Sequence, residues 1–586
     1  MNIQKYLSVG VLLFLTFAIG TAQNITVKKT AEQTHAFWIY FKDKGPQALL
    51  KKQKAEELLS ARALQRRLKT RGTKALVEFS DKPLYEPYVR QVKQIAAKIR
   101  VQSRWLNAVS VEASQEQLQK ISGFAAVAKI APVRMYRKKT PQPEIRPLQA
   151  ESRGLAKSSG LDYGSAQSQI SIINADALHE KGLSGRGVLI AMLDDGFNLL
   201  YTHITFDSLR NDNRIEDTWD FIHQDASVED HNYWNDGTHG TKTLSVIGGN
   251  TPGQLIGTAY GASFLLAKTE MDSTEVQAEE DTWVAGIEWA EQNGADIVSS
   301  SLGYGYYATD PASSWYTWED MDGETAVVTI AADLAVDKGV LVFNSAGNEN
   351  DNADHNTLSA PADGNKVLAV AAVTSSGTRA SFSSVGPTAD GRIKPDIAAM
   401  GSGVVYASSS YDSLFNSGNG TSFSCPLAAG AAALLLEAFP GTSPEKIQQA
   451  LRSTASQANA PDKYLGWGIM DAAAAYDYLE TNGLSETPSG QIPKHLEIYV
   501  NYPNPFNAAT RIRYKLSSAS RVRVTVFDQN GREVLVSRSF NKAAGLNSLT
   551  LHMNRFASGV YYYHIHATEF GSGQRYTKSG KMILLK

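Results

Sequence analysis

The stretch that decides the fold spans residues 188–196 and reads Val-Leu-Ile-Ala-Met-Leu-Asp-Asp-Gly. Six consecutive apolar residues are typical of a parallel strand that is covered on both faces, and the glycine lets the chain turn sharply after two carboxylates. Similar buried-strand patterns follow at residues 295–299, 340–343 and 367–371, and helical patterns lie between them at 283–292 and 325–337. This order predicts a doubly wound α/β domain with a mostly parallel sheet, in which functional groups gather beyond the carboxyl ends of the strands.

Composition places the chain among ordinary globular proteins. Hydrophobic residues make up 42% and charged residues 20% of its 586 residues, a length that holds about three or four domains at roughly 150 residues each. A single cysteine excludes an internal disulfide framework and any site built from several cysteines. The chemistry of this protein therefore uses other side chains.

The region before the α/β domain, which we place at residues 151–484, has a different pattern. Residues 23–150 alternate short strands, expected at 36–41, 73–79, 101–111 and 125–135, with helices, expected at 48–71, 86–98 and 115–121. This alternation predicts a small α+β domain. The basic stretch at 137–143 contains two prolines and is typical of an exposed linker.

A third pattern begins after the Ser/Pro/Gly-rich linker at residues 485–493. Residues 521–527 alternate charged and apolar side chains, and Asn530 and Gly531 are typical of a tight hairpin turn. Further short strands are expected at 533–539, 548–553, 560–567 and 581–585. Residues 494–586 are therefore expected to form a C-terminal β-sandwich.

The first 22 residues are typical of a cleaved secretory signal peptide. Lys5 precedes an apolar run from Tyr6 to Ile19, which is short for a membrane span, and small residues follow from Gly20 to Ala22. No later run is apolar over about 18 residues, so we expect no transmembrane segment in the mature chain. The expected location is outside the cell or at its surface, reached through the periplasm.

Three stretches of the α/β region carry a carboxylate, a base and a nucleophile. Asp194 ends a buried strand, His239 lies within residues 236–241 at the start of an apolar helix, and Ser422 opens another helix. A serine hydroxyl is a weak nucleophile until a histidine accepts its proton, and a buried aspartate orients that histidine. A helix start also supplies backbone N–H groups to a developing oxyanion. Asn348, which follows another buried strand, adds an amide donor for the same oxyanion.

In motifs and in their order, this region resembles the subtilisin-like serine proteases, the subtilase family. Its Asp-x-Gly, His-Gly-Thr, Gly-Asn-Glu and Gly-Thr-Ser-x-x-x-Pro motifs follow the family's order within residues 151–484. The resemblance implies that Asp194 is the orienting acid, His239 the general base, Ser422 the nucleophile and Asn348 the oxyanion donor. It implies a serine endopeptidase that hydrolyses protein or peptide substrates through an acyl-enzyme.

The resemblance also implies a substrate-binding surface. One stretch matches the family's strand that pairs with an extended peptide, and another matches a wall of the primary specificity pocket. The residues concerned are Ser301, Leu302 and Gly303 in the first stretch and Ala360, Pro361 and Ala362 in the second.

The chain departs from the family's motifs at two places. Asp195 stands where the family usually has serine or threonine, and strand alternation predicts that its side chain points away from that of Asp194. Phe423, Ser424 and Cys425 replace the commoner Met-Ala-small run after the nucleophile. We interpret Cys425 as a small buried thiol; sensitivity to mercurials is the alternative.

Charge is distributed unevenly, although the net formal charge is only −2. Residues 24–150 carry +16, residues 151–485 carry −28 and residues 486–586 carry +9. The basic N-terminal region is similar to the family's inhibitory propeptide, and charge complementarity favours docking on its own acidic domain over binding nucleic acid. We therefore expect the propeptide to be an intramolecular inhibitor that is removed by autoprocessing between Tyr136 and Gly160, and no nucleic-acid partner.

The C-terminal region is similar to the sorting domains of proteins exported by the type IX secretion system. The residues that carry this resemblance are 502–507, 527–533, 559–561 and 581–586. The implied partner is the type IX secretion machinery. A fibronectin-like sandwich that binds carbohydrate or protein is the alternative, because fold does not fix function.

The implied chemistry requires no cofactor. Members of the family often bind structural calcium, and acidic residues cluster between 207 and 230 and between 310 and 324. Their spacing identifies no ligand set, so the metal-binding residues are unknown and a solvated acidic face is the default interpretation. The alternative to an enzyme is a catalytically inactive, surface-displayed binding protein that keeps the fold; intact Asp194, His239 and Ser422 argue against it.

Overall fold

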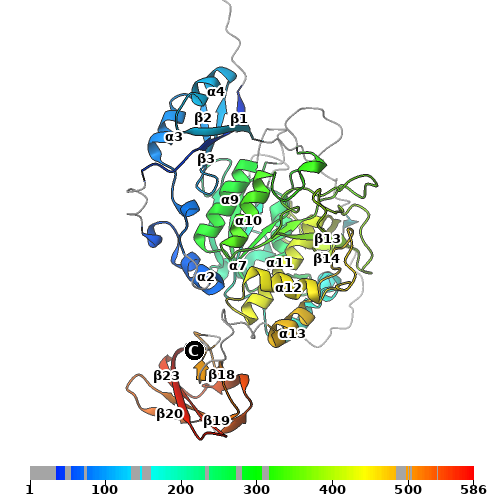
Figure 1. Ribbon diagram of the computed structural model, residues 1–586. Coiled ribbons are helices and arrows are strands. Elements are labelled where there is room, and N and C mark those ends of the chain that lie inside the picture. Colours follow the sequence, from blue (N-terminus) through cyan, green and yellow to red (C-terminus); the bar gives the residue numbers. More distant parts are fainter. Residues whose placement is uncertain are drawn as a thin grey trace, which may run out of the picture.

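The computed structural model of the chain describes residues 34–46, 54–71, 76–133, 146–147, 160–230, 237–271, 280–305, 316–482, 496–498, 501, 504–536 and 539–586. These residues form an N-terminal domain (34–133), a central domain (160–482) and a C-terminal domain (496–586), shown in Figure 1. The expected signal peptide and the linkers expected at 137–143 and 485–493 lie outside the described residues.

The N-terminal domain is an antiparallel sheet with helices on one face. Its strands have the order β2-β3-β1-β4 and the bounds His35–Phe41 (β1), Lys98–Ser103 (β2), Ala108–Ala113 (β3) and Val127–Pro132 (β4). Helices α3 (Glu86–Lys93) and α4 (Gln115–Ser122) pack on the face that carries Ile39 and Phe41. Ala36 and Trp38 alternate with these residues and therefore face the central domain.

Two expectations for this domain are wrong. No strand forms at residues 76–79; the chain there leads into a single 3₁₀ turn at Phe79–Asp81, and the rest of the expected strand, 73–75, is outside the described residues. The strand expected at 101–111 is two strands, because Asn107 adopts a positive φ of 51° and turns the chain between β2 and β3. Of the basic helix expected at 48–71, residues 48–53 lie outside the described residues, and the rest is divided into η1 (Ala55–Glu57) and α2 (Ala61–Arg71).

The central domain confirms the expected doubly wound α/β fold. Seven strands pair in parallel in the order β14-β13-β12-β11-β6-β10-β7. Their bounds are Leu189–Asp194 (β6), Ile215–Asp220 (β7), Ser263–Lys268 (β10), Ile297–Ser300 (β11), Leu341–Ser345 (β12), Leu368–Val373 (β13) and Ile397–Met400 (β14).

Helices cover both faces of this sheet, and β6 contacts both layers. Ile190 and Met192 pack with α8 (His239–Gly248) and α11 (Thr421–Ala438). Leu189, Ala191 and Leu193 pack on the opposite face with α9 (Glu280–Asn293) and α10 (Val327–Asp337). Within the described residues, α11 has the length and apolarity of a membrane span, yet it is buried in the core of this domain.

Smaller elements complete the central domain. Its short helices are η3 (Gly164–Ala166), α5 (Gln167–Ser171), α6 (Ala175–Glu180), η4 (Ile204–Phe206), α7 (Asp207–Asn211), η5 (Trp318–Asp320), α12 (Pro444–Ser453) and α13 (Ala472–Asn482). Two hydrogen-bonded strand groups add β8 (Asn250–Thr251) with β9 (Leu255–Ile256), and β15 (Ser402–Ala407) with β16 (Phe415–Asn419) and β5 (Arg146–Pro147).

The C-terminal domain consists of two antiparallel sheets around one apolar core. The first has the order β17-β18-β22, with bounds Leu496–Ile498, Ala509–Leu516 and Gly545–His552. The second has the order β20-β19-β23-β24, with bounds Glu533–Val536, Ser520–Phe527, Gly559–Glu569 and Arg575–Leu584; β21 (Phe540–Lys542) pairs with β19. Val522, Val524 and Val526 alternate into this core, as the sequence pattern predicts.

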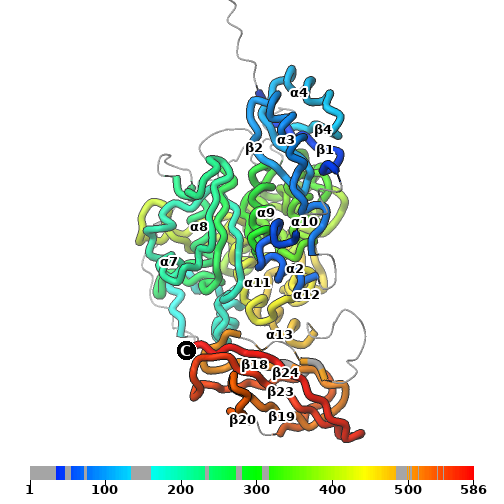
Figure 2. The backbone as a smooth tube through the Cα atoms, turned by 90° about the vertical axis from the view of Figure 1, so that its left-hand side faces the viewer, coloured from blue at the N-terminus to red at the C-terminus, as the bar shows by residue number. Residues whose placement is uncertain are grey.

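The N-terminal domain packs directly on α9 and α10 of the central domain (Figures 1 and 2). Trp38 is fully buried in the apolar cluster shared by the two domains, which also contains Trp283 of α9. This contact links folding of the central domain to the segment that precedes it.

Trp38→Ala is expected to destabilise the full chain by about 3–5 kcal/mol, because it removes a fully buried indole. The measurement is the denaturant midpoint of a chain that also carries Ser422→Ala to prevent self-digestion. Leu68→Ala is the control, since Leu68 is 58% exposed and its loss should cost less than about 0.5 kcal/mol. Equal midpoints for the two variants would contradict the role assigned to Trp38.

Candidate active site

Asp194 ends β6 inside the protein, and three groups donate hydrogen bonds to its carboxylate. Nδ1 of His239 lies 2.6 Å from Oδ1, the backbone N–H of Asp195 donates to the same oxygen at 2.9 Å, and the hydroxyl of Thr243 donates to Oδ2 at 2.9 Å. Because Nδ1 faces the carboxylate, it carries a proton and Nε2 keeps a free lone pair in the neutral ring. The arrangement therefore leaves Nε2 able to accept a proton.

The side chain of Asp195 holds the first turn of α8. Its carboxylate accepts the backbone N–H groups of His239 at 3.0 Å and Gly240 at 2.9 Å. A carboxylate at a helix N-terminus satisfies unpaired N–H groups and interacts favourably with the helix dipole. Asp195 thus fixes the helix end that carries His239, a role that strand alternation alone did not predict.

Gly240 allows α8 to start next to β6. A Cβ at this position would lie 2.2 Å from the carbonyl oxygen of Gly196 and 3.0 Å from the Cβ of Asp194. Since real contacts are not this short, any side chain at 240 would push the helix away from the strand. The glycine that follows the histidine is therefore required by packing between these two elements.

Ser422 is the second residue of α11 and follows a turn that requires a glycine. Gly420 has φ 155°, and a Cβ there would lie 2.9 Å from Oγ of Ser422. Pro426, four residues later, has no N–H to donate to the carbonyl of Ser422. The hydroxyl of Ser301 donates to that carbonyl instead, at 2.9 Å. The turn that presents Ser422 is thus joined to the stretch expected to bind substrate.

Asn348 is oriented by the residue next to Ser422. Its Oδ1 accepts hydrogen bonds from both the backbone N–H and the hydroxyl of Thr421, each at 2.9 Å. The acceptor end of the amide is therefore committed to α11, and its Nδ2 group is the end that can donate to a ligand. This is the orientation that an oxyanion donor needs.

The two stretches expected to bind substrate lie side by side. Tyr304 and Ala360 exchange backbone hydrogen bonds at 2.8 Å in both directions, which joins residues 301–304 to 360–362. Leu302, Ala360, Pro361 and Ala362 are buried, whereas Ser301 and Gly303 are half-buried. Burial of these side chains leaves the backbone as the part of both stretches that an extended peptide could contact.

Cys425 is fully buried beneath Ser422. Its thiol lies 3.4 Å from the carbonyl oxygen of Ser300 and 3.7 Å from Oγ of Ser299. Burial raises the pKa of this thiol to about 12, so it stays protonated and unreactive at neutral pH. These features agree with a small buried thiol.

Two groups of side chains in the described residues bring together ligand types that metals use. In the first, Asp194, Asp195 and His239, the oxygens are already committed to protein donors. In the second, Asp220, His223 and Asp230, the buried ammonium of Lys268 contacts both carboxylates. Neither group suits a calcium ion, because protein donors already occupy the carboxylates of the first group and a buried ammonium contacts both carboxylates of the second.

Thr243 is a residue of the candidate site that the sequence motifs did not indicate. It lies four residues after His239 on α8, and residues at this spacing share a helix face. Its hydroxyl therefore reaches the carboxylate that also binds the imidazole. Helical spacing is the signal that could have found it.

Comparison with protein-family models matches all three domains. Residues 185–468 match the subtilase family, residues 36–146 match a peptidase propeptide domain of Bacteroidota, and residues 500–578 match a secretion system C-terminal sorting domain. The N-terminal domain is therefore a propeptide, and the C-terminal domain implies export or surface attachment by the type IX route.

Curated relatives and a solved structure agree with these matches. Subtilisin NAT from Bacillus subtilis subsp. natto is 30% identical over 363 residues, which cover 62% of this chain and 82% of the relative. Subtilisin DY from Bacillus licheniformis is 32% identical over 311 residues, 52% of this chain and 97% of the relative. Fervidolysin from Fervidobacterium pennivorans, a keratinolytic enzyme related to subtilisin, is 18% identical and superposes with a TM-score of 0.52 over 94% of this chain and 77% of its own. The chain belongs to the subtilase family and is a serine endopeptidase.

Proposed function

We propose that Ser422 attacks the carbonyl carbon of a peptide bond and that His239, oriented by Asp194, is the general base. Nε2 of His239 takes the proton of the Ser422 hydroxyl, and the imidazolium that results stays paired with Asp194. The imidazolium then gives its proton to the leaving amine, and water releases the acyl group in the reverse sequence. The observation that carries this proposal is the 2.6 Å hydrogen bond between Asp194 and Nδ1 of His239.

The proposed oxyanion site lies at the start of α11. Nδ2 of Asn348 would donate to the negative oxygen of the tetrahedral intermediate, with the N-terminus of α11 beside it. Residues 301–303 and 360–362 would hold the substrate backbone in an extended form. The substrate class is protein or peptide, and the chemistry proposed here uses only protein groups.

The chain is proposed to be an autoprocessed zymogen. Its proposed parts are a signal peptide (1–22), a propeptide (23–150), a peptidase domain (151–484), a linker (485–493) and a sorting domain (494–586). Cleavage would fall between Tyr136 and Gly160, and export would pass through the periplasm to the type IX machinery. Calcium binding stays a proposal without assigned residues. The matches to a propeptide and a sorting domain support this organisation.

Ser422→Ala is expected to abolish both self-cleavage and labelling by a fluorophosphonate probe, because it removes the nucleophile. The measurement follows chain mass and label over time in residues 23–586 of the wild type and the variant. Wild type should lose its N-terminal segment and take the label at Ser422. Cleavage that proceeds equally in both chains, or label on another residue, would contradict the assignment.

Asn348→Leu is expected to lower kcat of the matured enzyme by about 10²- to 10³-fold with little change in KM, because one oxyanion donor is lost. Steady-state kinetics on a short peptide substrate measure both constants. Thr421→Val is the comparison, since it keeps the backbone N–H that orients Asn348 and should cost less. An unchanged kcat in Asn348→Leu would remove Asn348 from the mechanism.

Thr243→Val is expected to lower kcat about tenfold, because a hydrogen bond to a charged group contributes roughly 1.5–3 kcal/mol and its loss loosens Asp194. Thr243→Ser keeps a hydroxyl at the same place and should restore kcat. Steady-state kinetics of both variants provide the test. If valine and serine reduce kcat equally, the effect comes from packing and not from the hydrogen bond.

A further inference from the structure

Helix α2 and the turn after it form a contact with the peptidase domain that is separate from the propeptide sheet. Arg62, Arg66 and Arg67 lie on α2, and all three donate hydrogen bonds to the end of α9 or to the residues just after it. Arg66 also donates to the carbonyl of Ala295 at 2.7 Å. Cationic side chains at a helix C-terminus satisfy its free carbonyls and interact favourably with its dipole.

Glu291 of α9 is held by two of these arginines. Arg67 donates to its two carboxylate oxygens from Nε at 2.9 Å and from Nη2 at 2.8 Å, and Arg66 pairs with the same carboxylate. The side chains of Arg67 and Glu291 are fully buried. Although burial opposes ionisation, the arginines hold the pKa of Glu291 below its usual value, so the pair is charged.

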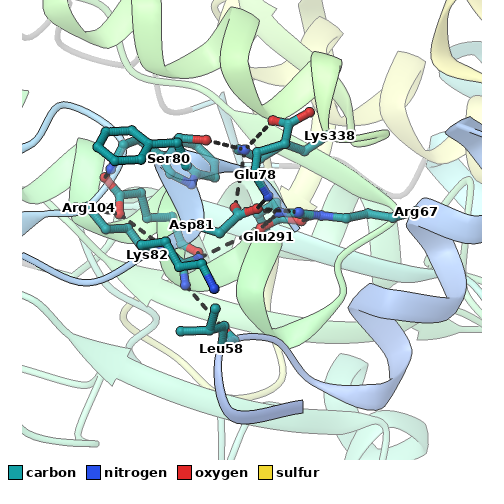
Figure 3. A network of polar contacts seen from close by, with 12 residues as sticks. Leu58, Arg67, Glu78, Ser80, Asp81, Lys82, Arg104, Glu291 and Lys338 are labelled. Atoms are coloured by element: carbon teal, nitrogen blue, oxygen red, sulfur yellow. Dashed lines mark hydrogen bonds and ion pairs between the residues drawn. The ribbon is translucent and has the colours of Figure 1, made fainter. Parts of the chain in front are cut away.

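The same cluster contains a contact of opposite polarity. Lys338, which follows α10 in the peptidase domain, lies 3.2 Å from Asp81 and 3.1 Å from Glu78 of the propeptide. Asp81 also accepts two hydrogen bonds from Arg67, at 2.7 and 2.9 Å. Figure 3 shows Arg67 extending toward Asp81 and Glu291, with Lys338 next to Glu78 and Ser80.

At this contact the peptidase domain presents the buried anion Glu291 and the buried cation Lys338, and the propeptide pairs each with a side chain of opposite charge. We call Arg66, Arg67 and Asp81 of the propeptide, with Glu291 and Lys338 of the peptidase domain, the clamp. Arginine is well suited to such a position, because its planar fork binds two carboxylates at once. A partner with the wrong charge at either position would bury an unpaired ion, which is costly.

We propose that the clamp is a docking site, additional to the contact of the propeptide sheet with α9 and outside the catalytic cleft, that selects the cognate propeptide and holds it on the enzyme after cleavage. This inference rests on the proposed function, in which the propeptide inhibits the site around Ser422. Release of the propeptide, and with it the onset of activity, then depends on the clamp as well as on the cleft. Glu291 and Lys338 have no part in the chemistry, so their loss should not change the mature enzyme.

The test measures release without relying on self-cleavage. Full-length chains carrying Ser422→Ala receive a recognition site for a sequence-specific protease after Pro141, are cut with that protease, and are followed by gel filtration as the propeptide dissociates. Glu291→Gln and Lys338→Met should each speed dissociation at least about tenfold, because truncating one partner of a buried charged pair mainly raises the off-rate. The matched controls in the same domain are Glu445→Gln, at an exposed residue, and Lys366→Met, at a half-buried residue whose side chain is 43% exposed; both should leave the rate unchanged.

Two further variants keep the result decisive. Arg67→Lys keeps the positive charge but loses the planar fork, and should speed dissociation less than Glu291→Gln. If Glu291→Gln does not fold, Arg67→Lys serves as the test of the clamp in its place.

In a chain that keeps Ser422, matured Glu291→Gln should hydrolyse a short peptide at the wild-type kcat/KM. Dissociation at the wild-type rate in Glu291→Gln and Lys338→Met, or in Arg67→Lys, would overturn the proposal. Absence of self-cleavage in wild type contradicts the zymogen mechanism instead, and leaves the dissociation test valid.

Discussion

Strand β6 sets the main constraint on this structure, because all six of its residues are buried and the last one is a carboxylate. A buried charge without partners is costly, so the protein must supply donors around Asp194. Two of the donor side chains, His239 and Thr243, come from α8. The position of α8 is therefore set by the needs of Asp194. The contact that stabilises the buried charge is also the contact that orients the imidazole.

Helix α11 joins the remaining parts of the site to each other. Thr421 orients Asn348, and the carbonyl of Ser422 holds Ser301. Both contacts use backbone groups of the first turn of α11 that have no partner within the helix. The N–H of Thr421 has none because it lies at the helix start. The carbonyl of Ser422 has none because Pro426, four residues later, carries no N–H. The residues of the Gly-Thr-Ser-x-x-x-Pro motif thus act together, since the glycine leaves space beside Ser422 and the proline leaves the carbonyl of Ser422 to accept from Ser301.

The sequence predicted the features that depend on local pattern. The parallel sheet followed from continuous apolar strands, and strand β19 of the C-terminal domain followed from period-two alternation. The predictions for Asp195 and for residues 76–79 were wrong because contacts with residues distant in sequence determine the conformation there. Alternation within a strand was applied to Asp195, but β6 ends at Asp194, and the carboxylate of Asp195 caps α8 instead of following the alternation. Residues 76–81 carry no strand; Leu76 and Asp81 there accept hydrogen bonds from Arg67, a partner that no local pattern indicates.

The clamp also bears on how this sequence can change over generations. Glu291 belongs to the peptidase domain, yet its buried partners, Arg66 and Arg67, belong to the propeptide, which the proposed maturation discards. A substitution at 291 that leaves the finished enzyme intact still leaves two arginines unpaired in the precursor. Natural selection therefore acts on α9 through a partner absent from the working protein, and positions 66, 67 and 291 should vary together across related chains.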